Sequence, residues 1–133
     1  MTVPIRTINP WTWQDPLGYA QAIEVSAGSH ALYCAGQTAI DAAGQPSHAG
    51  DIAAQAALAL DNLETVLDRA GYAMADVARL NYYVTDTAAF FAIYPHVIER
   101  LQRLGCRPAS TLLQVAGLAF PELLVEIEAT AFR

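Results

Sequence analysis

Two carboxylates near the end of the chain, Glu126 and Glu128, are the residues whose type and spacing most clearly suggest chemistry. They lie in an apolar stretch, 123–132, that predicts a β-strand. Side chains two positions apart in a strand project from the same face, so the carboxylates share one face while Val125 and Ile127 occupy the other. A strand this apolar is not expected to lie fully in water. We therefore expect at least one carboxylate near a cleft or an interface, although an exposed sheet face or a buried ion pair explains the same pattern.

The other reactive side chains are weaker candidates. His96 and Glu99 share a predicted helix face, but two ligands without a third do not define a metal site, and neither a metal nor another cofactor is expected. Ser110 lies in no Gly-x-Ser-x-Gly turn and has no histidine near it in sequence, which disfavours acyl transfer through serine. Cys34 and Cys106 lie in no redox motif and are expected to be reduced core residues.

Two segments have the periodicity of amphipathic helices. Apolar residues recur every three or four positions across 51–70, with Asp51 placed to cap the start and Gly71 placed just after the end. A second helix is predicted over 86–105. Pro95 lies inside this run and cannot donate a backbone hydrogen bond, so we expect the helix to kink there or to restart with Pro95 in its first turn.

The remaining regular segments predict strands. A strand is expected within the first nineteen residues, followed by a loop that contains Trp11 and Trp13. Two strands then flank a turn at 27–30, and three more follow the first helix; the predicted strands after the loop are 20–25, 31–39, 77–84, 110–116 and 123–132. The order β-β-β-α-β-α-β-β predicts an α+β fold in which both helices pack on one face of a mixed sheet.

Length and composition favour one domain spanning residues 1–133. Hydrophobic residues make up 54% of the chain and charged residues only 15%, an apolar excess that favours a subunit interface. No apolar stretch is long enough to span a bilayer and the first residues lack the layout of a signal peptide, which predicts a cytoplasmic protein without a membrane partner. The net charge is −6 and lysine is absent, so nucleic-acid binding and Schiff-base chemistry are disfavoured.

Several short segments stand in an order and spacing typical of one family. They are Gly18-Tyr19, Ala35-Gly36-Gln37, Gln55 with Leu60-Asp61-Asn62, Val84-Thr85-Asp86, Pro108-Ala109, Val115-Ala116 and Val125-Glu126-Ile127-Glu128-Ala129. Through them, nearly the whole chain from about Tyr19 to Ala131 resembles the Rid (YjgF-like) proteins. These are the reactive intermediate deaminases, formerly labelled L-PSP endoribonucleases.

The resemblance implies a chorismate-mutase-like fold and a homotrimer whose ligand clefts lie between subunits. In the best-studied branch of the family, this cleft hydrolyses 2-imino acids to 2-keto acids and ammonia. An arginine binds the substrate carboxylate, a glutamate positions a water, a glycine N–H helps to hold the carboxylate, and a tyrosine closes the pocket. Carried over by position, the glutamate is Glu126, the glycine is Gly36 and the tyrosine is Tyr19.

One departure from the family pattern bears directly on the substrate. The position of the carboxylate-binding arginine holds Ser110. A bidentate guanidinium–carboxylate contact consists of two charge-assisted hydrogen bonds, and losing both weakens carboxylate binding by roughly two to four orders of magnitude. A serine hydroxyl offers a single neutral donor. Efficient hydrolysis of simple 2-imino acids is therefore not expected.

Other substitutions favour an apolar ligand site. Where a small hydroxyl residue often precedes the Gly-Gln pair, this chain has Ala35, and where the second helix often has asparagine, it has Tyr94. With Leu112 and with Trp11 or Trp13 nearby, the cleft is expected to be more apolar and aromatic than the deaminase pocket. Such a pocket suits a neutral or aromatic ligand better than a small anion.

Three functions remain open from the sequence. The first is glutamate-assisted hydrolysis of an imine, an enamine or a related small electrophile that needs no carboxylate clamp. The second is a non-catalytic trimer that binds a small molecule or a partner. The third, the inherited endoribonuclease label, is disfavoured because an acidic chain without lysine is repelled by RNA.

Overall fold

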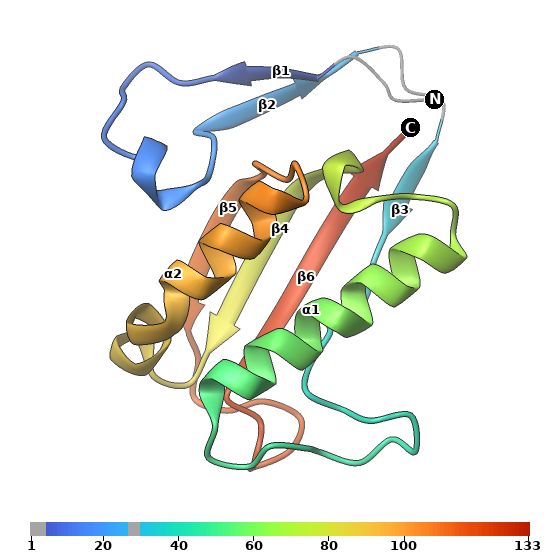
Figure 1. Cartoon of the computed structure of the whole chain (residues 1–133), viewed down its shortest axis with the longest axis vertical. Coiled ribbons are helices and arrows are strands. Elements are labelled where there is room, and N and C mark those ends of the chain that lie inside the picture. Colours follow the sequence, from blue (N-terminus) through green and yellow to red (C-terminus); the bar gives the residue numbers. More distant parts are fainter. Residues whose placement is uncertain (1–4, 27–29) are drawn as a thin grey trace.

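The computed structural model describes residues 5–26 and 30–133 of the chain (Figure 1). Its regular elements follow the predicted order of strands and helices, with two short 3-10 turns added. The elements are β1 (Ile5–Ile8), η1 (Asp15–Leu17), β2 (Ala22–Val25), β3 (Ala31–Tyr33), α1 (Ile52–Arg69), η2 (Met74–Asp76), β4 (Val77–Val84), α2 (Thr87–Arg103), β5 (Ala109–Gln114) and β6 (Val125–Phe132). Residues 27–29 of the predicted turn lie outside the described residues.

The main sheet has four strands in the order β3-β6-β4-β5. The β4–β5 pair is parallel, whereas β6 is antiparallel to both β3 and β4. Both helices cover the same face of this sheet (Figure 1). The predicted α+β architecture, a mixed sheet with two helices on one face, is therefore confirmed.

The first two strands form a small sheet of their own. β2 pairs antiparallel with β1, and an ion pair between Arg6 and Glu24 joins them. The predicted strand at 20–25 was too long at its start, because Ala20 instead forms an isolated parallel bridge with Ala109 at the edge of the main sheet. That bridge ties the segment after η1 to the beginning of β5.

The first helix agrees closely with its prediction. The Asp51 side chain accepts a hydrogen bond from the Ala54 N–H at 3.0 Å, which is the expected N-cap contact. After the helix ends, Gly71 adopts a φ of +82°, a left-handed conformation that glycine enters without steric cost.

The predicted restart of the second helix at Pro95 is wrong. α2 is one helix from Thr87 to Arg103, with Pro95 inside it. Proline removes the hydrogen bond to the carbonyl four residues earlier, that of Phe91. Pro95 and Phe91 are both exposed, so water can satisfy that carbonyl and the helix continues.

The core lies between the helices and the main sheet. Along β6, buried and half-buried residues alternate, so Val125, Ile127 and Ala129 face the helices. Leu80 and Tyr82 do the same on β4. The opposite face of the sheet therefore carries the intervening polar residues. Among the described residues, no helix is long and apolar enough to cross a membrane.

Candidate functional site

The carboxylate of Glu126 lies against the backbone of Gly36. A Cβ atom at position 36 would come within 2.6 Å of the Glu126 Cδ and within 2.9 Å of its Oε2. Only a residue without a side chain allows this approach. No hydrogen bond or ion pair joins the Glu126 side chain to another described residue, so both of its oxygens remain available to a ligand or a water.

A β-bulge produces this close approach. The Cys34 N–H donates to the Ala129 carbonyl at 2.9 Å, and Gln37 exchanges two backbone hydrogen bonds with Ile127, at 2.7 and 2.8 Å. Regular pairing places one residue between these contacts on each strand, but two residues, Ala35 and Gly36, occupy that interval. No described residue accepts a backbone hydrogen bond from the N–H of either bulge residue. The predicted strand 31–39 was therefore too long, since β3 ends at Tyr33.

The second carboxylate, Glu128, is occupied by its neighbours. Its Oε1 accepts hydrogen bonds from the Tyr83 hydroxyl at 2.8 Å and from the Asn81 side-chain amide at 3.3 Å. The hydrogen bond to Glu128 raises the pKa of the Tyr83 phenol, because it stabilises the protonated phenol beside a carboxylate. The two glutamates share one face, as the sequence predicted, but only Glu126 is free to act on a ligand.

We expect Gly36→Ala to displace the Glu126 carboxylate. Position 36 has no left-handed backbone, so alanine adds only the contact with Glu126. Rotation of the glutamate out of its rotamer should cost about 0.5–1.5 kcal/mol of unfolding free energy. In a Glu126→Ala background the same substitution should cost almost nothing. Urea unfolding of the four proteins measures this coupling, and an equal cost in both backgrounds would contradict the contact.

The predicted ligand residues Ser110 and Leu112 project toward the helix side of β5. Ser110 is paired with Leu80 and Leu112 with Tyr82, and directly paired residues in neighbouring strands share a face. The Ser110 hydroxyl donates a hydrogen bond to the Leu80 carbonyl. It is therefore already committed within the sheet and is not presented to a ligand as a donor.

The two predicted tyrosines lie beside this edge. The Tyr94 ring is 5.9 Å from the ring of Tyr82, and its hydroxyl donates to the Leu17 carbonyl at 3.2 Å. Burial raises the pKa of the Tyr94 phenol, with a smaller contribution from the nearby Tyr19. Tyr19 is half-buried and its ring lies 6.3 Å from that of Trp13. Tyr94 thus joins α2 to η1 and to β4.

The predicted site residues thus form two separate groups. Ala35, Gly36 and Glu126 lie on β6 and the bulge beside it, and Glu126 is paired with Tyr83 on the face turned away from the helices. Ser110 lies on β5, on the helix face and two inter-strand spacings, about 10 Å, from β6. One subunit does not bring the two groups into a common pocket.

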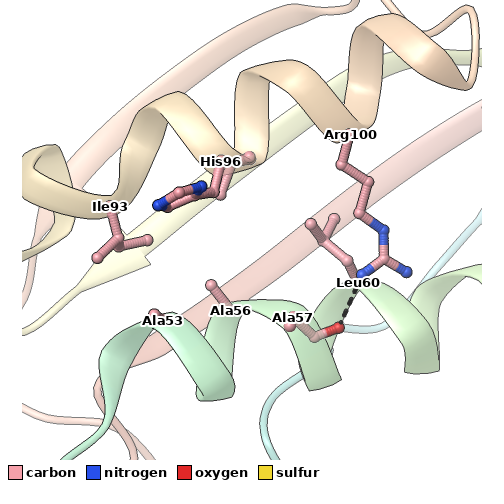
Figure 2. Close-up of a pocket in the computed structure, with 8 residues that line it drawn as sticks. Ala53, Ala56, Ala57, Leu60, Ile93, His96 and Arg100 are labelled. Atoms are coloured by element: carbon pink, nitrogen blue, oxygen red, sulfur yellow. Dashed lines mark hydrogen bonds between the residues drawn. The ribbon is translucent and has the colours of Figure 1, made fainter.

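Of two hollows on the single subunit, only the larger lies beside a predicted site residue. An open groove of about 570 Å³ lies beside Gly36, between the bulge segment and α1. A smaller hollow of about 60 Å³ lies between the helices, with Ala53, Ala56 and Leu60 on α1 opposite His96 on α2 (Figure 2). Among the described residues, no group of three histidine, cysteine or acidic side chains is arranged to hold a metal ion.

Arg107 lies beside Tyr19, and its charge is already paired within the protein. Its guanidinium forms an ion pair with Asp15 and donates to the Tyr19 carbonyl at 3.3 Å. Sequence reasoning did not assign this role, nor that of Tyr83 beside Glu128. The sequence signal for the role of Tyr83 was that Asn81 and Tyr83 lie two positions apart, on the polar face of β4. Once the β4–β6 register is known, Asn81 lies opposite Glu128 and Tyr83 opposite Glu126.

Comparison with known proteins places the chain in a family. The family model described as Endoribonuclease L-PSP matches residues 14–133. The chain is 34% identical to a RutC family protein of Pyrococcus horikoshii over 119 residues, which are 89% of this chain and 90% of the relative. It is 32% identical to protein DfrA of Myxococcus xanthus over 113 residues, covering 85% of this chain and 83% of that protein.

Solved structures agree with this placement. YyfB of Yersinia pestis, a Rid-family protein described as of unknown function, is 38% identical with a TM-score of 0.88, covering 97% of this chain and 98% of that one. The YjgF gene product of Escherichia coli is 26% identical with a TM-score of 0.66, covering 86% and 87% of the two chains. The chain therefore belongs to the Rid (YjgF-like, L-PSP) family and has its chorismate-mutase-like fold.

Proposed function

We propose that this chain is a cytoplasmic homotrimeric hydrolase that acts on an imine, an enamine or a related small electrophile in a cleft between subunits. The proposal rests above all on the Glu126 carboxylate, which lies against Gly36 and forms no hydrogen bond or ion pair with the described residues. Beside it, the free N–H groups of Ala35 and Gly36 offer donors to a bound ligand. Family membership supports the reaction class.

In this reaction Glu126 acts as a general base on water. The carboxylate accepts a proton as the water oxygen bonds to the imine carbon, and it passes that proton to the nitrogen, giving a carbinolamine. A second proton then moves from the carbinolamine hydroxyl through the same carboxylate to the nitrogen, the carbon–nitrogen bond breaks, and ammonia leaves as the carbonyl forms. One imine and one water give one carbonyl compound and one ammonia. Tyr83 keeps Glu128 occupied, so Glu126 alone serves as the base.

A second subunit is needed to complete the cleft. Ser110 and Leu112 project from the helix face of β5, whereas Glu126 projects from the other face of β6. In a homotrimer, the bulge and Glu126 of one copy can lie opposite Tyr19, Tyr94, Ser110 and Leu112 of the next. The exposed Leu113 on the face of the sheet without helices supports burial of that face between copies.

The replacement of arginine by Ser110 alters the specificity of this cleft. The serine hydroxyl is bound to the Leu80 carbonyl and cannot replace a guanidinium. Simple 2-imino acids should therefore be poor substrates. The acidic net charge and the absence of lysine argue against ribonuclease activity.

Ammonia release from imines generated in situ tests this function. We expect Glu126→Gln to lower the rate about a hundredfold, because the amide cannot accept the proton from water. Glu122→Gln is the matched control, since Glu122 is exposed and its side chain lies outside both groups. Its rate should equal that of the unmodified chain.

The outcomes separate catalysis from binding. Equal rates in Glu126→Gln and the unmodified chain would remove Glu126 as the base. If the folded, trimeric protein accelerates no imine, with or without a carboxylate, the hydrolase proposal fails. Ligand binding without turnover then becomes the better account, and the open groove beside Gly36 would be its site.

A further inference from the structure

Four aromatic residues lie on α2 and on the segments that flank η1. We refer to Trp13, Tyr19, Phe91 and Tyr94 as the aromatic wall. The Tyr94 ring lies 6.2 Å from that of Phe91, edge to face, and the rings of Trp13 and Tyr19 form a second edge-to-face pair 6.3 Å apart. The hydrogen bond from the Tyr94 hydroxyl to the Leu17 carbonyl joins the two pairs.

Within the wall, the Tyr94 ring is fixed by core residues, whereas Trp13 and Phe91 are largely exposed. Tyr82 and Phe90, both buried in the core, hold the Tyr94 ring at centroid distances of 5.9 and 5.4 Å. Trp13 and Phe91 are 59% and 56% exposed, which is unusual for side chains of this size. Rings held rigidly by others lose little conformational entropy when a ligand packs on them.

Three polar groups at or near the wall already have partners. The Arg107 guanidinium is paired with Asp15, and the Ser110 hydroxyl is bonded to the Leu80 carbonyl. The Tyr94 hydroxyl is bonded to Leu17. A carboxylate brought here would lose its water without gaining a charged partner, which is costly, whereas a neutral ring would gain aromatic contacts.

We propose that the substrate is a neutral imine bearing an aromatic ring, with the ring packed on the aromatic wall of one subunit and the imine carbon beside Glu126 of the next. The inference rests on the proposed function for the position of the imine. The chemistry of the ligand that packs on the wall is argued independently of the reaction, from the four aromatic rings, the fixed position of Tyr94 and the absence of an unpaired charge among the groups named above.

Three matched probes test the substrate class by calorimetry. Benzamide is neutral and aromatic, benzoate has the same ring with a charge, and cyclohexanecarboxamide is neutral without an aromatic ring. We expect benzamide to bind at least about tenfold more tightly than either of the others. Benzoate binding as tightly as benzamide would overturn the choice of a neutral ligand, and equal binding of cyclohexanecarboxamide would overturn the aromatic contact.

Substitutions locate the bound ring. Trp13→Leu and Tyr94→Leu should each weaken benzamide binding about three- to tenfold, since an aromatic pair contributes about 0.5–1.5 kcal/mol beyond its buried area. Phe120→Leu is the control, because Phe120 is an exposed aromatic residue on the loop between β5 and β6. Circular dichroism and urea unfolding establish that each variant is folded. If Trp13→Leu changes the oligomer mass but not benzamide affinity, another copy of the chain covers the wall and the proposal is wrong.

Failure of this inference can be told apart from failure of the proposed function. Benzamide binding is measured without turnover, and Glu126→Gln should leave it within about threefold, because the probe's main contact is with the rings. Retained benzamide binding without imine hydrolysis would remove the catalytic function and leave the ligand class standing. Hydrolysis that depends on Glu126 but occurs only with carboxylated imines would support the proposed function and overturn the proposed ligand class.

Discussion

Gln55→Ala is expected to lower the free energy of unfolding by roughly 3–5 kcal/mol, because it removes three hydrogen bonds from the protein interior. The Gln55 amide nitrogen donates to the carbonyls of His48 and Glu122 at 3.1 and 2.8 Å. Its oxygen accepts from the Leu124 N–H at 2.8 Å. Gln55 is 0% exposed, so water does not replace these partners without rearrangement.

Two further variants separate the hydrogen bonds from other effects. Gln55→Met has a similar volume but cannot form the three bonds, so it should cost nearly as much as alanine. Gln102→Ala makes the same change at an exposed position of α2 and should stay within about 0.5 kcal/mol of the unmodified chain. Urea unfolding at one fixed protomer concentration gives these values, since association contributes to stability. A cost below 1 kcal/mol for Gln55→Met would show that the bonds contribute little.

Gln55 also connects the first helix to the candidate site. Leu124 immediately precedes β6, and Glu126 is the second residue of that strand. The glutamine therefore fixes the point at which the chain enters β6, while Asn62, two turns further along α1, bonds to the carbonyls of Thr38 and Ile40 after the bulge. One helix thus anchors both segments that bring Glu126 and Gly36 together.

The sequence predicted those parts of the fold that local patterns determine. The helix at 51–70 was read from its apolar spacing and its cap, and both are local properties of the chain. Of the two outcomes predicted at Pro95, a kink or a restart, the restart is wrong because the cost of a proline depends on whether water reaches the freed carbonyl, which only the packed structure decides. The separate β1–β2 sheet depends on pairing between segments, and strand propensity does not define a partner.

The candidate site was predicted only in part, for a similar reason. Period-two alternation placed Glu126 and Glu128 on one face, and the family resemblance singled out Glu126 and Gly36. The bulge at Ala35 and Gly36 could not be read from the sequence, because it is a mismatch between two strands about ninety residues apart. The difference between the two glutamates depends on the same kind of information, since Tyr83 meets Glu128 through the β4–β6 register.

Ser110→Arg is expected to strengthen benzoate binding by roughly a hundredfold or more, with a matching fall in KM for aromatic 2-imino acids. Two charge-assisted hydrogen bonds contribute about 1.5–3 kcal/mol each, whereas the lost bond to the Leu80 carbonyl is neutral and contributes about 0.5–1.5 kcal/mol. Ser110 is half-buried on an edge strand, so the longer side chain can follow the strand and place its guanidinium at the rim.

Gln45→Arg is the control that isolates the position of the new charge. Gln45 is exposed on the loop between β3 and α1 and belongs to neither group of site residues. Both variants change the net charge of −6 by the same amount, and long-range attraction for benzoate rises in both. If Gln45→Arg strengthens benzoate binding as much as Ser110→Arg, the effect is general electrostatics and Ser110 does not face the ligand. If only Ser110→Arg does so, the cleft still has the geometry of a carboxylate site, and the serine is what excludes acidic substrates from it.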